Sequence, residues 1–104
     1  MEADFDKLWQ ARGEHVVDRD GRHVGKVADI AFEPNTDKPD WLVVKPSMLR
    51  RPRLVPLAVA VEDGHEIRVP FSKETVLNAP VPTIPITPGT SECAALLEHY
   101  RRAA

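Results

Sequence analysis

The chain has 104 residues, of which 14 are lysine or arginine and 16 are aspartate or glutamate, so its formal net charge at pH 7 is −2. This balance excludes a general attraction to nucleic acid or to an anionic membrane, and any such contact has to be local. The length predicts one domain that buries roughly two thirds of the surface of its unfolded chain. The single cysteine, Cys93, excludes an internal disulfide and a cysteine-based zinc site, and favours a reducing cytoplasm.

Apolar residues occur in short runs, none of which approaches the roughly 20 residues that span a bilayer. The first residues, MEADFDKLWQAR, also lack the basic and apolar regions of a secretory signal. We therefore expect a cytoplasmic protein without membrane insertion. Within residues 1–12, Phe5, Leu8 and Trp9 share one helical face, which predicts a short helix or turn that ends at Gly13.

A β-hairpin is predicted to follow this segment. Residues 14–19 and 22–33 have the composition of strands and flank Asp20-Gly21, a pair that favours a two-residue type I′ turn. The apolar alternation of the second strand slips at Gly25, which predicts a β-bulge. Because a bulge increases the bend of a strand, it helps a small sheet to curl toward a barrel.

Three further strands complete the predicted sheet. A long turn over Pro34–Asp40 leads to a third strand over Trp41–Val44. A basic loop, Ser47–Arg53, follows, and then a fourth strand over Leu54–Val61 and a fifth over His65–Pro70. Four large apolar side chains are expected in the core: Trp41, Leu49, Leu57 and Phe71.

The remaining segments are predicted to be helical, apart from a spacer. Ser72 caps a short helical turn, SKETVLN. Within residues 80–90, Pro82, Pro85 and Pro88 recur at every third position, which is typical of a stiff, extended connector. Residues 91–104 predict a helix with an apolar stripe made of Cys93, Leu96, Leu97 and Tyr100. A helix of this length is marginal alone, so it packs on its own barrel or on a second copy, and the pattern leaves both arrangements open.

Several of these segments together resemble the PRC-barrel domain family: the run from Val16 to Val44, VPL at Val55–Leu57, EDG before HEIRVP, FSKETV before Ala79-Pro80, and the late LLEHY. The family includes the cytoplasmic domain of the photosynthetic reaction centre H subunit and the C-terminal domain of a ribosome-maturation factor. The resemblance implies a small β-barrel, here residues 13–79, that docks on a larger assembly and catalyses no reaction. The expected fold class is mainly β, a partly open antiparallel barrel of five to six strands with a short helical turn and a C-terminal α-helix after the proline-rich spacer.

The residues that invite a catalytic or metal-binding interpretation have simpler explanations. His15 and His23 lie on the two arms of the first hairpin, but a zinc site needs three or four ligands, so solvent-facing histidines are favoured. Four aspartates occupy turn positions that favour this residue: Asp18, Asp20, Asp37 and Asp40. No glycine-rich phosphate loop, HExxH or G-x-S-x-G motif is present, so we expect no enzyme and no cofactor or metal site.

Two surfaces are candidates for partner binding. The first is the apolar face of the last helix, with Leu96, Leu97 and Tyr100, or else an exposed barrel edge. Such a surface predicts a non-catalytic module that binds a protein or pairs with a second copy of itself. The basic loop predicts, as an alternative, a ribonucleoprotein accessory domain that contacts RNA or a ribosomal protein through Arg50, Arg51 and Arg53. We favour the first because the loop has no aromatic residues for base stacking. No small-molecule substrate is evident.

Overall fold

The computed structural model describes residues 11–32, 39–81 and 90–103. Its elements are β1 (His15–Val17), β2 (His23–Phe32), β3 (Pro39–Lys45), β4 (Arg53–Pro56), the 3-10 helix η1 (Leu57–Val59), β5 (Val61–Asp63), β6 (Glu66–Arg68), α2 (Lys73–Leu77) and α3 (Thr90–Ala103). Three predicted features lie outside the described residues: the helix or turn near the N-terminus, most of the second turn, and most of the proline-rich spacer.

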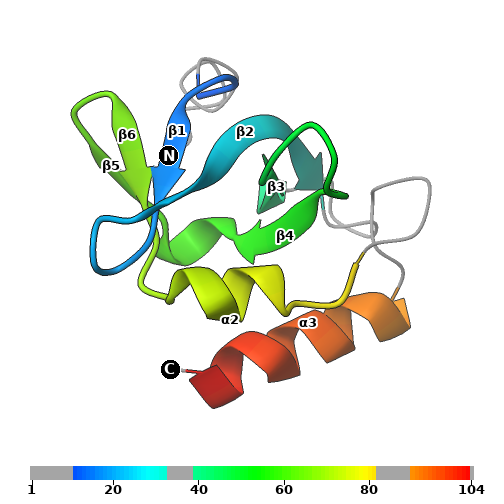
Figure 1. Ribbon diagram of the computed structural model, residues 1–104. Coiled ribbons are helices and arrows are strands. Elements are labelled where there is room, and N and C mark those ends of the chain that lie inside the picture. Colours follow the sequence, from blue (N-terminus) through cyan, green and yellow to red (C-terminus); the bar gives the residue numbers. More distant parts are fainter. Residues whose placement is uncertain (1–10, 33–38, 82–89, 104) are drawn as a thin grey trace.

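Backbone hydrogen bonds join all six strands into one sheet in the order β4-β3-β2-β1-β6-β5. Neighbouring strands are antiparallel except β1 and β6, which pair in parallel. The sheet curls without closing, because β4 and β5 remain its two edges (Figure 1). This arrangement confirms the prediction of a mainly β, partly open barrel with a short helical turn and a C-terminal helix.

The predicted bulge in β2 lies next to Gly25. Val16 pairs with Gly25 and Val17 pairs with His23, so Val24 is an extra residue on the β2 side. A Cβ atom on Gly25 would collide with the carbonyl oxygen of Lys45 and lie 2.9 Å from the Cα atom of Pro46. Glycine at this position therefore lets the end of β3 approach β2 closely.

The first hairpin forms where the Asp-Gly pair predicts it, but through a different turn. The amide of Gly21 donates to the carbonyl of Asp18 (3.0 Å), and the amide of Asp18 donates to the carbonyl of Arg22 (2.8 Å). The loop therefore has three residues, and Arg19 and Asp20 are the centre of its hydrogen-bonded turn instead of Asp20 and Gly21. Gly21 completes the loop with a φ of 85°.

The predicted single strand over Leu54–Val61 is wrong. The chain leaves the sheet after Pro56, forms one 3-10 turn closed by the amide of Ala60 and the carbonyl of Leu57 (3.1 Å), and re-enters as β5. The reason is topological. Because β4 and β5 are opposite edges of the sheet, the segment has to cross the barrel between them instead of continuing along one strand.

The core lies between the curled sheet and the two helices, and α3 runs along α2 beneath the barrel (Figure 1). Trp41 and Phe71 are buried as predicted, and Leu57 is half-buried. Leu49 is 97% exposed, so its predicted place in the core is wrong. The predicted cap of α2 is confirmed, since the hydroxyl of Ser72 accepts a hydrogen bond from the amide of Thr75 (3.1 Å).

Candidate functional site

Asp18, directly after β1, is a fully buried carboxylate. Its Oδ1 accepts from the amides of Asp20 (2.9 Å) and Arg22 (2.8 Å), and its Oδ2 accepts from the amide of Lys73 (2.9 Å). Burial alone would raise the pKa of Asp18, but the amides of Arg22, Lys73 and Asp20 and the guanidinium of Arg22 together lower the pKa below its ordinary value. The carboxylate therefore fastens the first hairpin to the beginning of α2.

Arg22 extends this fastening to the surface. Its Nε donates to Oδ2 of Asp18 (3.0 Å), and its two terminal nitrogens donate to the carboxylate of Glu74 on α2 (2.7 and 3.1 Å). The hydrogen bonds from Arg22 lower the pKa of Glu74. Because each acid in this cluster is already engaged by donors from the same chain, the cluster holds two elements together and offers no free carboxylate for acid–base chemistry.

The two histidines of the first hairpin are in direct contact. Nδ1 of His15 and Nε2 of His23 are 2.9 Å apart, so one ring donates and the other accepts. Burial and the neighbouring charge of His15 lower the pKa of His23. Across residues 11–32, 39–81 and 90–103, no third histidine, cysteine or acid joins them in a group that is placed to hold a metal ion.

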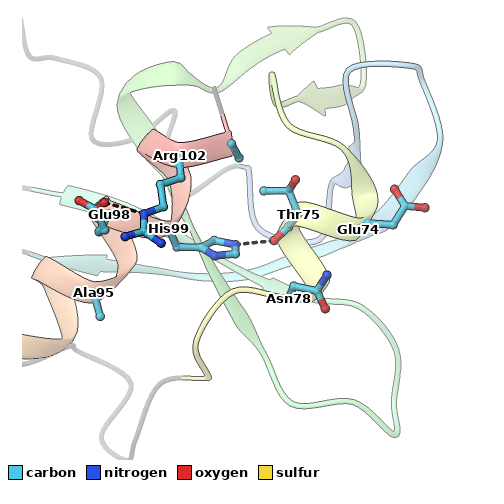
Figure 2. A pocket seen from close by; sticks show the side chains of 8 residues that line it. Glu74, Thr75, Asn78, Ala95, Glu98, His99 and Arg102 are labelled. Atoms are coloured by element: carbon cyan, nitrogen blue, oxygen red, sulfur yellow. Dashed lines mark hydrogen bonds and ion pairs between the residues drawn. The ribbon is translucent and has the colours of Figure 1, made fainter.

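A hollow of about 570 Å³ lies between α2 and α3, and Figure 2 shows the side chains that line it. Nε2 of His99 lies 2.8 Å from the carbonyl oxygen of Thr75 and links the two helices across it. Glu98 accepts hydrogen bonds from Arg101 and Arg102 on its own helix. Of the polar side chains in this hollow, His99 therefore joins α3 to α2 through its hydrogen bond.

The three apolar residues predicted to bind a partner on α3 have different surroundings. Leu96 and Tyr100 are buried against the barrel of the same chain. The Tyr100 hydroxyl donates to the carbonyl of Leu54 (2.6 Å), and its ring centre lies 4.6 Å from that of Phe71. Burial raises the pKa of Tyr100 well above its ordinary value. Leu97, in contrast, is 56% exposed, so it is the one of the three with a side chain open to solvent.

Leu97 borders an apolar groove of about 870 Å³ between α3 and the crossing segment that follows β4. The opposite wall includes Ala58 and Val59 of η1, and Val59 is 42% exposed. Glu98 and Arg101 also line the groove. This groove could not be predicted from the sequence, because η1 lies within the segment whose pattern predicts a continuous strand.

The three arginines of the β3–β4 loop also differ. Arg53 donates to the carbonyls of Leu77 (3.2 Å) and Arg51 (2.6 Å), so its guanidinium holds the base of the loop to the end of α2. Arg50 and Arg51 are exposed. The tip of the same loop carries Met48, which is 91% exposed, beside Leu49. Nothing in the sequence pattern around Met48 indicates that its side chain is exposed at a loop tip.

A comparison with protein-family models matches residues 10–76 to the PRC-barrel domain, which covers more than half of the chain. The chain belongs to the PRC-barrel family. PRC-barrel domains are generally non-catalytic modules that mediate protein interactions. A comparison with curated proteins finds no match. In the described part of this PRC-barrel chain, no helix has the length and apolar character that crossing a membrane requires.

Proposed function

We propose that this PRC-barrel chain is a non-catalytic assembly module that pairs with a second copy of itself through the groove between α3 and η1. The observation that carries the proposal is that Leu97 and Val59 are both exposed and line the same groove, whose walls are largely apolar. Adjacent apolar side chains left open to water favour association, because burying them removes apolar surface from solvent. The family's general habit of mediating protein interactions supports the same role.

A second copy is the occupant that the charges around the groove favour. Glu98 and Arg101 both line the groove and form an ion pair with each other on α3, so their charges balance beside the apolar centre. In a two-fold contact the same patch meets itself, and a patch whose charges balance meets its copy without net repulsion.

The test is sedimentation velocity over a range of protein concentrations. We expect the weight-average sedimentation coefficient of the wild type to rise with concentration, and Leu97→Asp to abolish the rise because it places a charge in the centre of the contact. Val81→Asp is the matched control, since Val81 is also exposed but does not line the groove. A wild type that stays monomeric throughout, or a Leu97→Asp variant that still associates, would overturn the proposal.

A further inference from the structure

The β3–β4 loop presents two aliphatic side chains at the tip of an ordered turn. Met48 and Leu49 are 91% and 97% exposed. They are the central residues of a turn in which the amide of Arg50 approaches the carbonyl of Ser47 (3.4 Å) and the amide of Leu49 the hydroxyl of Ser47 (3.3 Å). Turn centres usually carry small or polar residues, so an exposed Met-Leu pair there points to an apolar environment outside the chain.

Unpaired cations surround this tip. Arg50 and Arg51 follow Leu49 directly and are exposed. Lys26 of β2 and Lys45 of β3 are register partners, which places two like charges opposite each other across the sheet. Such a pair destabilises a sheet. None of these four cations has an ion pair with a carboxylate of the described residues, so their charge remains available to an anion.

The lysine pair and the apolar tip belong to one surface. A hollow of about 310 Å³ is lined by both lysines, His23, Pro46, Ser47 and Met48. The exposed acids of β5, Glu62 and Asp63, lie on the edge strand farthest from β3 and β4. Four cations without a carboxylate partner among the described residues therefore lie around this loop, although the chain as a whole has a net charge of −2.

We propose that the β3–β4 loop docks this protein on an anionic membrane surface. Met48 and Leu49 enter the boundary between headgroups and acyl chains, while Lys26, Lys45 and the two arginines contact lipid phosphates. A bilayer fits this surface because it accepts a protruding apolar tip without a preformed pocket. RNA fits less well, because the tip offers aliphatic side chains where single-stranded RNA is held by aromatic stacking. Figure 1 shows the loop on the side of the barrel away from α3, so this docking is independent of the proposed pairing.

The test is co-sedimentation of the full chain with vesicles at low salt. We expect binding to phosphatidylcholine vesicles that contain about one third phosphatidylserine, and little binding to pure phosphatidylcholine. The variant Met48→Ser/Leu49→Ser should bind more than tenfold more weakly, because it removes the inserted aliphatic groups. Lys26→Gln and Lys45→Gln should each weaken binding about fivefold. These side chains lie outside the core cluster of buried residues, so the variants should keep the fold.

Matched controls place the same changes elsewhere. Val61→Ser and Arg102→Gln alter an exposed apolar residue on β5 and an exposed cation on α3, and they should leave vesicle binding unchanged. Equal loss in these controls would overturn the proposal, as would undiminished binding of Met48→Ser/Leu49→Ser. A single-stranded RNA that binds at low salt while anionic vesicles do not would overturn it in favour of the ribonucleoprotein alternative.

Discussion

The β1–β2 loop and the β3–β4 loop both connect neighbouring antiparallel strands and both carry charged residues. They differ in whether these charged side chains are buried in the chain or exposed to solvent. In the β1–β2 loop the carboxylate of Asp18 is fully buried and accepts four hydrogen bonds from Asp20, Arg22 and Lys73. In the β3–β4 loop, Arg50 and Arg51 reach into solvent beside an exposed apolar tip. Charged residues in a loop therefore indicate binding only where the chain itself leaves them unsatisfied.

The two faces of α3 repeat this contrast with apolar residues. Leu96 and Leu97 are neighbours in the sequence, but one is 1% exposed and the other 56% exposed. The inward residue contributes to the core, while the outward residue borders the groove. Substitutions at these paired positions distinguish residues that stabilise the fold from residues that belong to a proposed binding surface.

The largest effect is expected on the inward face of α3. Leu96→Ala removes a buried side chain and leaves a cavity, which should lower the free energy of unfolding by about 2–5 kcal/mol. Leu97→Ala should change it by less than about 0.5 kcal/mol, because the side chain is exposed. Urea denaturation followed by circular dichroism measures both. Equal losses for the two variants would show that α3 does not pack on the barrel as described.

A slightly smaller loss of stability is expected from a substitution in the β1–β2 loop. Asp18→Ala leaves the buried amides of Arg22 and Lys73 without their acceptor, and should lower the free energy of unfolding by about 2–4 kcal/mol. The exposed neighbour Asp20 is the control, since Asp20→Ala should change stability by less than about 0.5 kcal/mol. If denaturant midpoints of the two variants coincide, the carboxylate of Asp18 does not fasten the hairpin to α2.

The same carboxylate gives a pH dependence with a defined sign. The folded-state pKa of Asp18 lies below its unfolded value of 3.8, so its ionised form stabilises the fold above that pH, and this contribution declines as the pH falls through the folded-state pKa. The stability difference between the wild type and Asp18→Asn should therefore narrow as the pH falls below about 4. Urea denaturation across this pH range measures the difference, and a gap that widens with acid would contradict the lowered pKa.

The smallest effect on stability is expected from substitutions in the β3–β4 loop. Met48→Ser/Leu49→Ser should leave the free energy of unfolding within about 0.5 kcal/mol of the wild type, because both side chains are almost fully exposed. A thermal melt of the two proteins checks this. A marked loss of stability would mean that the tip packs on the chain, and the contrast with the β1–β2 loop would then fail.

The sequence predicts the features that depend on neighbouring residues. The Asp-Gly pair marks the first hairpin, Ser72 marks the beginning of α2, and the apolar stripe marks α3. Features that depend on contacts between residues far apart in the chain could not be predicted from the sequence. Asp18 and Lys73 are 55 residues apart, and the meeting of Lys26 with Lys45 depends on strand register. Leu49 has a large apolar side chain, which is typical of a core residue, but only the path of the β3–β4 loop shows that this side chain faces solvent.

We propose that two copies meet through the groove between η1 and α3. Amide hydrogen exchange at low and at high protein concentration tests it most directly, because it locates any interface along the chain. We expect slower exchange at high concentration in Leu57–Val59 and α3, with the β2–β3 region unchanged. Exchange that is independent of concentration in these segments, or slowing confined to other parts of the barrel, would contradict it.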